Sequence, residues 1–537
     1  MEIYNLLKKQ ARVFADRPFF YSSDQSSDAI SYDTLQITYI EALHRVNLLI
    51  AKLESININR THRVAVALGN HPNFFLTLLA LNRLDVCAVP LNMDQNIHEI
   101  NHILTHSEAS ILLSADEYMN TFSKLASDFK NVLPVLRFQS DWKDEKNLKQ
   151  GVRSTTEVAI VYTSGTTGTP KGCILSEDYF LDTGKWYENI GGLLSLEKGE
   201  ERILTPLPTS HVNSLVFSFM GVLSSGSCLV QLDRFHPSSW WDDVRKSEAT
   251  AIHYLGVMPA ILLSMPSKNN DYVGNQVKFG FGAGVEPDDH EEFEKRFGFP
   301  LVEGWAMTET GGAGCMMVSE EPRHIGTRCI GVPPSQLEYR IVSEIDEDAR
   351  TGEDGELLVR RSGANKRSGF FSGYFKDQFA TSAAWAGGWL RTGDIVREGN
   401  DRSLYFVDRK KNIVRRSGEN ISVSEVENVL SRSPIVQRCA VAPVKDSLRG
   451  EEVFACVILD QNARASLRAA QSIFEFSRKY LSYFKSPAYI AFVDTIPVTS
   501  NQKISRAQTK KLSEELILSG KVYSFIALKR RGERMII

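Results

Sequence analysis

Thr163-Ser-Gly-Thr-Thr-Gly-Thr-Pro-Lys-Gly172 is the stretch of this 537-residue sequence that decides the fold, and it directly follows an apolar run at residues 158–162. The stretch contains three glycines, five hydroxyl side chains and one lysine. Glycines let backbone N–H groups turn inward as an anion-binding nest, while hydroxyls and a lysine add donors and a mobile positive charge. We therefore predict a polyphosphate-binding loop at the end of a buried strand. The alternative is a flexible surface loop.

The loop differs from a Walker phosphate-binding loop, because Lys171 lies between Pro170 and Gly172 where that motif has Gly-Lys-Ser/Thr opening a helix. Residues 162–172 resemble throughout the signature Tyr-Thr-Ser-Gly-Thr-Thr-Gly-x-Pro-Lys-Gly of the adenylate-forming superfamily of acyl-CoA synthetases, adenylation domains and luciferases. The resemblance makes Lys171 a candidate catalytic residue. It also implies a set of nucleotide contacts, namely Thr163, Ser164, Gly165, Thr166, Thr167 and Gly168.

Short apolar runs alternate with helical stretches on both sides of this loop, which is typical of parallel sheets covered on both faces. The runs are residues 64–68, 87–91, 109–113, 158–162, 203–207, 228–232, 252–255 and 277–281, and the first helical stretches are 74–84 and 97–106. Residues 340–410 instead favour short strands and turns. From residue 424 a compact unit follows, with helices at 424–432 and 465–483 and strands near 438–442, 453–459 and 489–493.

A chain well beyond about 250–300 residues is expected to divide into domains. We predict an α/β fold with a large N-terminal domain, residues 1–408, of mostly parallel sheets flanked by helices plus a β-rich subdomain. A small mobile α+β C-terminal domain, residues 409–537, follows it.

Further segments resemble superfamily motifs in the expected order. Gly304-Trp-Ala-Met-Thr-Glu-Thr310 is similar to Tyr-Gly-x-Thr-Glu, in which the aromatic residue stacks near adenine. The resemblance implies that Thr308 contacts the α-phosphate and that Glu309 holds Mg²⁺, for which a carboxylate is a suitable ligand. Trp305 and Ala306 depart from the motif: the first keeps a stacking face, and the second narrows the nucleotide slot or the adjacent acyl pocket.

Two more segments imply nucleoside contacts. Gly282-Ala283-Gly284 resembles the segment that lines adenine, and Trp389-Leu-Arg-Thr-Gly-Asp394 resembles the Thr-Gly-Asp motif. A two-oxygen acceptor such as Asp394 suits the vicinal diol of ribose. Asp408-Arg409-Lys410-Lys411 resembles the interdomain hinge, with Arg409 as a ribose contact and Lys411 as the pivot. An isolated run of this kind more often forms a solvated face.

Two candidates follow the hinge. Gly418, in Arg415-Arg-Ser-Gly-Glu-Asn420, resembles the glycine that lines the pantetheine tunnel. Pro497-Val-Thr-Ser-Asn-Gln-Lys-Ile-Ser-Arg506 resembles Pro-x-Thr-x-x-Gly-Lys-x-x-Arg, which makes Lys503 the candidate adenylation lysine, although Gln502 replaces the usual glycine. Taken alone, Lys503 would be read as a surface lysine.

The resemblance implies an ATP-dependent acid:CoA ligase that forms an acyl-AMP and then a thioester, with ATP, Mg²⁺ and coenzyme A as cofactors or co-substrates. One alternative is a freestanding adenylation enzyme that loads a carrier protein. Another is a regulatory protein that kept the fold and lost the chemistry, which the presence of Lys503, Glu309 and Asp394 argues against.

The small-molecule carboxylic acid is less constrained. After Leu207-Pro-Thr-Ser-His211 the sequence lacks the aspartate that amino-acid-activating relatives use to hold an α-ammonium, and His211 is itself a candidate catalytic residue. Residues 370–375 and 404–427 resemble most the carnitine/crotonobetaine–CoA ligase branch, so a betaine-type or a short-to-medium-chain acid is expected. Aromatic candidates for a cation pocket, or alternatively for ordinary core, are Phe217, Tyr254, Phe279, Phe281 and Trp305.

The net charge of -3 supplies no global field for nucleic acid or an anionic membrane, so neither is expected as a partner. Seven cysteines without a CxxC pair indicate reduced thiols and a cytoplasmic enzyme. Residues 1–20 read as a first helix rather than a signal peptide.

Residues 215–232 read as a buried helix, turn and strand rather than a membrane span, so no integral membrane segment is expected. The basic tail, with Lys529, Arg530, Arg531 and Arg534, is most simply a solvated or partner-contacting end. A homo-oligomer is compatible with these features.

Overall fold

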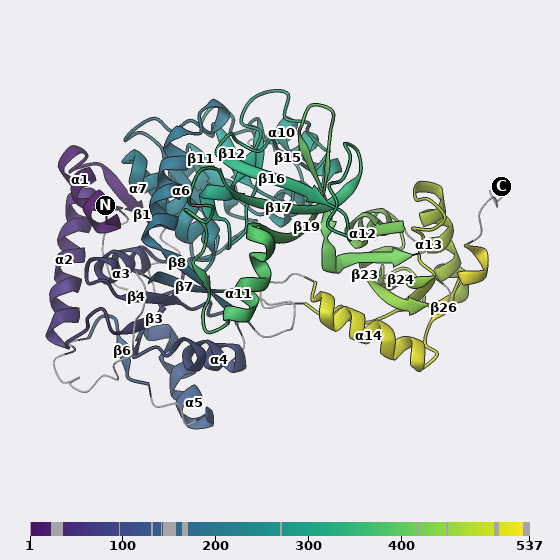
Figure 1. The fold of residues 1–537 in the computed structure, drawn as a ribbon, viewed down its shortest axis with the longest axis horizontal. Coiled ribbons are helices and arrows are strands. Elements are labelled where there is room, and N and C mark those ends of the chain that lie inside the picture. The colour runs from purple at the N-terminus through teal and green to yellow at the C-terminus, as the bar shows by residue number, and fades with distance from the viewer. Residues whose placement is uncertain are drawn as a thin grey trace.

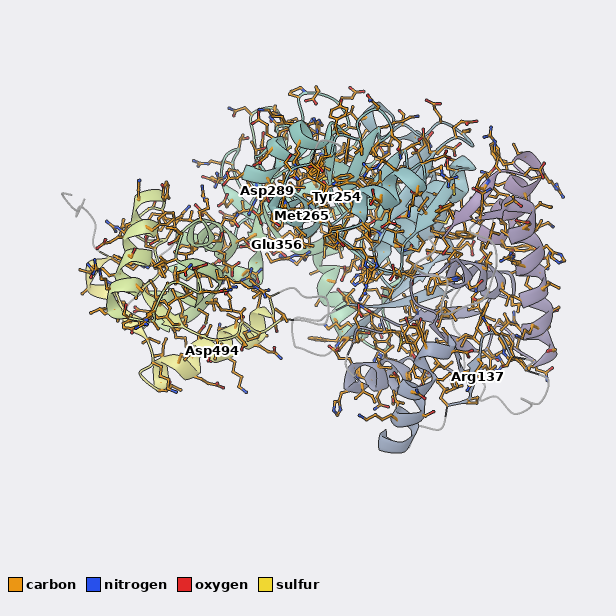
Figure 2. The ribbon with its side chains drawn as sticks, turned by 180° about the vertical axis from the view of Figure 1, so that it is seen from behind. Arg137, Tyr254, Met265, Asp289, Glu356 and Asp494 are labelled. Carbon is orange, nitrogen blue, oxygen red and sulfur yellow. The ribbon has the colours of Figure 1, made fainter. Side chains whose placement is uncertain are left out.

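The computed structural model describes residues 2–22, 36–95, 97–129, 133–140, 142, 157–163, 170–268, 271–416, 419–446, 449–498 and 504–529. Two mostly parallel sheets and one antiparallel sheet form a large body, and a smaller α/β unit lies to one side of it (Figure 1). Seen from behind, Glu356 lies at the edge of the large body toward the small unit, and Asp494 lies within that unit (Figure 2).

The first mostly parallel sheet carries the glycine-rich loop. Its strand order is β18-β8-β7-β4-β3-β5-β6, with β8 and β18 antiparallel to their neighbours. Strands β3, β4 and β5 are buried at every position, because the sheet is covered on both faces. The bounds are β3 (Arg63–Ala67), β4 (Cys87–Pro90), β5 (Ile111–Ser114), β6 (Val135–Arg137), β7 (Glu157–Thr163), β8 (Lys171–Ser176) and β18 (Gly373–Tyr374).

The second mostly parallel sheet has the order β14-β13-β12-β11-β9-β10-β1-β2, with antiparallel strands β2 and β14 at its edges. One continuous apolar core joins the two sheets. The bounds are β1 (Pro18–Tyr21), β2 (Gln36–Thr38), β9 (Arg202–Thr205), β10 (Cys228–Gln231), β11 (Ala251–His253), β12 (Phe279–Gly282), β13 (Leu301–Trp305) and β14 (Met316–Met317).

Helices cover these sheets, and their ends follow local signals. Thr38 caps α2 through a capping box with Glu41, and Pro72 opens α3, which is buried along almost its whole length. The bounds are α1 (Ile3–Val13), α2 (Tyr39–Ser55), α3 (Pro72–Arg83), α4 (Ile97–Ser107), α5 (Met119–Phe129), α6 (Glu177–Asn189), α7 (Phe219–Ser225), α8 (Trp240–Lys246), α9 (Val257–Ser264) and α10 (Pro287–Phe297).

An antiparallel sheet completes the large body, and a mixed sheet forms the small unit. The antiparallel sheet runs β15-β20-β19-β17-β16: β15 (Cys329–Gly331), β16 (Leu337–Val342), β17 (Asp354–Arg361), β19 (Leu390–Glu398) and β20 (Leu404–Arg409), with α11 (Gln378–Ala384) preceding β19. The small unit contains β21 (Ile413–Arg416), β22 (Glu419–Ser422), β23 (Val436–Asp446), β24 (Gly450–Leu459), β25 (Tyr489–Phe492), β26 (Tyr523–Ser524), α12 (Val423–Ser431), α13 (Leu467–Tyr480) and α14 (Arg506–Leu518).

The predicted fold class is confirmed, and the strands and helices predicted between residues 64 and 281 have ends within two residues of those observed. One difference lies at the N-terminus, where α1 ends at Val13 and β1 begins at Pro18, because a proline cannot continue a helix interior. Residues 215–232 form a π-helix (Asn213–Ser218), α7, a turn at Gly226 and β10, as predicted. In the described part of the chain, no helix combines the length and the apolar character needed to span a membrane.

The prediction of a solvated tail is wrong for Lys529, which is 2% exposed. Its Nζ lies 2.5 Å from Glu452 Oε2, and Arg416 Nε lies 2.6 Å from Oε1 of the same carboxylate. A buried carboxylate is costly unless cations are drawn to it, and this explains why the tail residue is buried. Arg530, Arg531 and Arg534 lie outside the described residues.

The junction between the two parts is the turn Lys410–Asn412, which separates β20 from β21. Lys410 Nζ lies 2.7 Å from Glu356 Oε2 of the large body. Polar side chains also meet across the junction: Asn428 Nδ2 donates to Glu286 Oε2 at 2.6 Å, and Arg415 lies 2.9 Å from Glu344. The division after residue 408 and the pivot at Lys411 stay predictions.

Candidate functional site

The predicted phosphate loop connects two antiparallel strands. Thr163 ends β7 and Lys171 begins β8, and the two residues are register partners across the hairpin. A strand, β8, follows the loop, whereas a helix follows a Walker loop, as the position of the lysine in the sequence indicates. The residues between them, Ser164, Gly165, Thr166, Thr167 and Gly168, lie outside the described residues.

Lys171 is held loosely at the mouth of this hairpin. Its Nζ lies 3.7 Å from Asp377 Oδ2 and 5.2 Å from the centre of the Tyr374 ring. Its side chain is 32% exposed. A half-exposed ammonium with one distant carboxylate partner can turn toward an incoming phosphate at little cost.

Glu309 and Lys171 both contact Tyr374. The Tyr374 hydroxyl donates to Glu309 Oε1 at 2.8 Å, and the Cys173 thiol lies 3.9 Å from the same oxygen. Burial, followed by the Glu309 charge, raises the pKa of both the Tyr374 hydroxyl and the Cys173 thiol, so both remain protonated donors. Strand pairing of Tyr374 with Cys173 fixes this arrangement.

Glu309 is suited to binding a Mg²⁺ ion that arrives together with a nucleotide. Within the part of the chain that the structure describes, it does not belong to a metal site built from protein side chains alone. Among the described residues, no group of three or more His, Cys, Asp or Glu side chains could hold a metal ion. Mg²⁺ typically uses one or two protein carboxylates together with substrate phosphates and water. The neighbouring residue Thr308 is held by its backbone, whose carbonyl accepts a hydrogen bond of 3.0 Å from the Tyr179 hydroxyl.

A second cluster surrounds Asp394. Register pairing of β19 with β20 sets Asp394 opposite Arg409, and the Arg409 Nε atom lies 2.7 Å from Asp394 Oδ1. The indole Nε1–H of Trp305 donates to Oδ2 at 2.8 Å. Burial raises the pKa of the Asp394 carboxyl, while Arg409 and the Trp305 hydrogen bond oppose that shift.

Asp394 retains acceptor capacity for a ligand. Among the described residues, its buried Oδ1 atom accepts no hydrogen bond of good geometry, although Arg409 is close. A carboxylate oxygen has about two acceptor sites, so Oδ1 can accept a ribose hydroxyl beside the Arg409 ion pair. Trp305 was expected only to stack near adenine. Its ring N–H also orients the Asp394 carboxylate, a contact that sequence motifs do not reveal.

The glycine segment after β12 is constrained by packing. A Cβ on Gly282 would come within 2.4 Å of the Tyr254 carbonyl, and Gly284 has φ +81°. The backbone N–H groups of Gly284 and Val285 both donate to Glu303 Oε1 at 2.9 Å. Ala283 and Gly284 are exposed at the strand end, so this segment can form one face of a nucleotide slot.

The structure therefore brings several predicted residues into two linked clusters. Lys171 and Glu309 meet at Tyr374, and Trp305, Asp394 and Arg409 meet through the β19–β20 hairpin. His211 is exposed in the turn before the π-helix. Lys503 and Gly418 lie outside the described residues. Sequence analysis did not single out Tyr374, which acts through strand pairing that a motif cannot display.

A pocket of about 380 Å³ lies between α6 and the segment Gly312–Met317, which follows Glu309 in the sequence. Trp186 of α6 lines it, and the Trp186 ring lies 5.4 Å from Phe217 and 5.8 Å from Phe281. Other lining residues include Asp182, Lys185, Ala313, Cys315, Met316, Met317 and Arg361. The five aromatic candidates Phe217, Tyr254, Phe279, Phe281 and Trp305 are all buried, and Phe279 is fully buried core.

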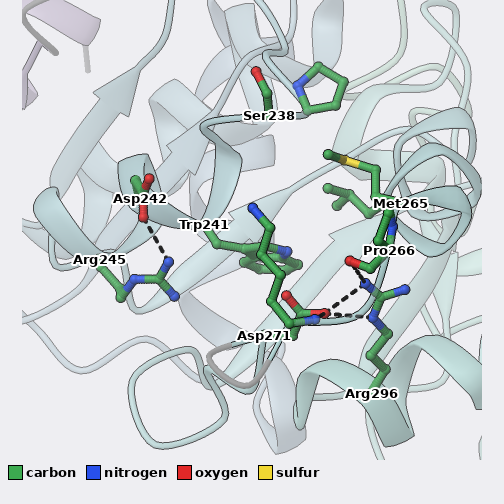
Figure 3. Close-up of a pocket in the computed structure, with 11 residues that line it drawn as sticks. Ser238, Trp241, Asp242, Arg245, Met265, Pro266, Asp271 and Arg296 are labelled. Atoms are coloured by element: carbon green, nitrogen blue, oxygen red, sulfur yellow. Dashed lines mark hydrogen bonds and ion pairs between the residues drawn. The ribbon is translucent and has the colours of Figure 1, made fainter.

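A smaller hollow of about 120 Å³ lies between α8, α9 and α10 (Figure 3). Arg296 closes it through contacts with Asp271 at 2.7 Å and with the carbonyl of Pro266 at 3.2 Å. None of the candidate residues lines this hollow.

This chain is similar to known ligases and synthetases in sequence and in fold. The crotonobetaine/carnitine–CoA ligase of Salmonella paratyphi B is 25% identical over 496 residues, which cover 88% of this chain and 93% of that protein. The o-succinylbenzoate CoA synthetase of Bacillus subtilis, solved with its acyl-adenylate intermediate, has a TM-score of 0.78 at 23% identity and covers 94% of this chain and 98% of its own. That synthetase has also been solved with ATP and a magnesium ion.

The amide bond synthetase McbA of Marinactinospora thermotolerans has a TM-score of 0.77 at 21% identity, covering 95% of this chain and all of its own. These structures establish the fold. The family model for AMP-binding enzymes matches residues 7–375, and that for the AMP-binding enzyme C-terminal domain matches residues 425–503. With most of its length matched in this way, the chain belongs to the family of AMP-binding enzymes.

Proposed function

We propose that this protein is an ATP-dependent acid:CoA ligase. It activates a carboxylic acid as an acyl-AMP and transfers the acyl group to coenzyme A, releasing pyrophosphate and AMP. The observation that carries the proposal is the buried Asp394 carboxylate, whose Oδ1 is ion-paired with Arg409 but accepts no well-aligned hydrogen bond from a described residue and so suits a ribose diol. The likeness to CoA ligases over almost the whole chain supports the same class.

In the first step, an oxygen of the substrate carboxylate attacks the α-phosphorus of ATP and pyrophosphate leaves. Asp394 and Arg409 hold the ribose, and residues 282–284 line the adenine. Thr308 and Lys171 contact phosphate oxygens, and Lys503 completes the set. Mg²⁺ at Glu309 would offset the charge of the phosphates. The protein contributes mainly positioning and charge stabilisation, as in other phosphate-transfer sites.

In the second step, the thiol of coenzyme A attacks the acyl carbon and AMP leaves. We assign residues 409–537 to a mobile domain that turns at Lys411, withdrawing Lys503 and presenting Gly418. The polar contacts across the junction, such as Asn428 with Glu286, support this motion, because polar surface contacts can be exchanged for others or for water. A closing domain also excludes water from a hydrolysable mixed anhydride.

The acid is proposed to enter the pocket beside Trp186. Trp186 lines the pocket and contacts the uncharged rings of Phe217 and Phe281, and burial lowers the pKa of His253, which contacts Phe281, to about 3, so that its ring is neutral. The carboxylate of Asp182 lines the same pocket. Lys185, which lies 3.6 Å from Asp182, and Arg361 line it as well, so the attraction for a cation would come from the aromatic face. An acid with a trimethylammonium group would bind that face through cation–π contact; a short-to-medium-chain acid is the alternative.

The acceptor and the location complete the proposal. Coenzyme A is favoured over a carrier-protein thiol by the likeness to CoA ligases. All seven cysteines are free and buried, which supports reduced thiols in the cytoplasm.

A pyrophosphate-release screen over a panel of carboxylic acids, run with and without coenzyme A, tests the function. We expect acid-dependent pyrophosphate release, and thioester formation only when coenzyme A is added. Acyl-AMP that transfers to a phosphopantetheinyl carrier protein but not to coenzyme A would favour the carrier-loading alternative. No release with any acid would contradict the proposed activity.

A further inference from the structure

Two histidines on α4 contact the hairpin that carries the phosphate loop, one on each side of the loop. His106 Nδ1 lies 2.8 Å from the hydroxyl of Tyr162, the residue before Thr163. His102 Nε2 lies 3.3 Å from the carbonyl oxygen of Pro170, the residue before Lys171. One helical turn separates the two rings, which stack with centroids 5.3 Å apart.

The same end of α4 is also tied to the segment that faces Lys171. Lys376 Nζ donates to the carbonyl oxygen of His106 at 3.0 Å and lies 2.8 Å from Glu108. Asp377, the next residue, is the carboxylate closest to Lys171. In Figure 1, α4 lies below α11, the helix that Asp377 caps. The C-terminal half of α4 therefore contacts the hairpin on both sides of the loop and the turn that carries Lys376 and Asp377.

The chemistry of these contacts assigns the proton on one ring. A carbonyl oxygen only accepts, so the His102 ring must carry its proton on Nε2. Burial raises the pKa of Tyr162, so its hydroxyl keeps its proton. Burial, reinforced by His102 and Lys376, lowers the pKa of His106, while Glu108 and Asp377 oppose the shift. A neutral His106 can form one hydrogen bond with the Tyr162 hydroxyl in either tautomer: Nδ1 donates when it carries the proton and accepts when it does not.

We propose that His102 and His106 are positioning residues of the adenylation step, which hold the strand ends bearing Thr163 and Lys171 at the separation that the ATP phosphates require. The inference rests on the proposed function, because it gives this hairpin the polyphosphate. The histidines act through the hairpin and are not themselves catalytic. If the strand ends are already held in place, ATP binding does not have to order them, and its free-energy cost is lower.

Binding of two probe ligands to the full-length protein tests this role. MgATP carries the phosphates that the hairpin would contact, whereas adenosine lacks them. Dissociation constants for both are measured for His106→Leu and His102→Leu, which remove the hydrogen bonds. They are also measured for His106→Asn and His102→Gln, whose amides reproduce Nδ1 and Nε2. His44→Leu on α2 is the control for losing a histidine elsewhere.

We expect each leucine variant to weaken MgATP binding by about tenfold, the size of one hydrogen bond, and to leave adenosine binding unchanged. The Asn and Gln variants should restore most of the loss. Tyr162→Phe should weaken MgATP binding as much as His106→Leu does. The double variant Tyr162→Phe/His106→Leu should bind MgATP no more weakly than either single variant, because both substitutions remove the same contact.

Several outcomes would overturn the inference while leaving the function intact. These are unchanged MgATP binding in the leucine variants, equal weakening of adenosine and MgATP, or amide variants as weak as the leucine ones. Thermal unfolding of each variant separates misfolding from weak binding, and Tyr162→Phe repeats the test without altering α4. Wild-type protein that binds neither ligand would overturn the proposed function and this inference together.

Discussion

The indole N–H of Trp305 donates a hydrogen bond of 2.8 Å to the carboxylate of Asp394, although the two residues are 89 positions apart in the chain. Trp305 ends β13 of a mostly parallel sheet, whereas Asp394 lies in the antiparallel sheet. The contact joins the adenine side of the proposed nucleotide site to its ribose side. It fixes one carboxylate oxygen, while the other is ion-paired with Arg409 and can still accept a hydroxyl from a ligand.

Trp305→Phe should move the acid limb of the pH profile. Burial raises the pKa of Asp394 and the Trp305 hydrogen bond opposes that rise, so losing the bond raises the pKa further. The ionised carboxylate is the form that accepts two hydroxyls, and ATP use is lost as the pH falls through this pKa. We therefore expect kcat/KM for ATP to begin falling at a higher pH than in the wild type. Trp389→Phe, at a tryptophan that packs on Arg360, is the matched control, and coincident profiles would contradict the role.

Tyr374→Phe should raise the Mg²⁺ concentration needed for pyrophosphate release. The hydroxyl hydrogen bond of 2.8 Å orients Glu309, and a ligand without its orienting partner typically binds metal about 10–100-fold more weakly. Glu309→Gln, which removes the charge, should cost more. Initial rates measured across a Mg²⁺ titration provide the test. Tyr339→Phe removes a similar hydrogen bond, of 3.0 Å to Glu398, and should leave the titration unchanged.

Lys503→Ala should abolish pyrophosphate release and preserve thioester formation from supplied acyl-AMP. The proposed lysine serves only the closed conformation, in which the α-phosphate reacts. Each half-reaction is assayed separately, with Lys510→Ala on α14 as the control. Equal loss of both half-reactions would contradict a lysine that acts in one conformation.

Gly418→Leu should abolish thioester formation and preserve pyrophosphate release, the reverse of Lys503→Ala. A branched side chain at the proposed pantetheine channel should block entry of coenzyme A, while adenylation proceeds because ATP and the acid bind elsewhere. Pyrophosphate release and thioester formation are measured on the same preparation. Unchanged turnover of coenzyme A would place the channel in another part of the protein.

The acid should be preferred when it carries a cation. We compare 4-(trimethylammonio)butanoate with its neutral isostere 5,5-dimethylhexanoate, which differ in charge and scarcely in shape. A preference of tenfold or more for the cation corresponds to about 1.4 kcal/mol, the size of one or two cation–π contacts. Trp186→Leu should remove that preference, whereas Trp389→Leu should keep it. Equal turnover of the two acids would favour a short-to-medium-chain substrate.

Local sequence determined much of this protein. The runs at residues 64–68, 87–91 and 158–162 fix buried strands because their apolar side chains must leave water on both faces, and the observed ends lie within two residues. The order of residues 162–172, with Lys171 after proline, also separates this loop from a Walker loop before any fold is known. These features depend on neighbours in the chain, which a sequence displays directly.

Tertiary structure alone decided the contacts between distant residues. The Tyr374 hydroxyl reaches Glu309 because β18 pairs with β8, and the Trp305 ring reaches Asp394 because two sheets meet there. Lys529 is buried because it pairs with Glu452, 77 positions away in the chain. Local composition alone predicted a solvated tail there. Such contacts arise where buried polar atoms must find partners, and which partners come within reach depends on the packing of whole elements rather than on any local pattern.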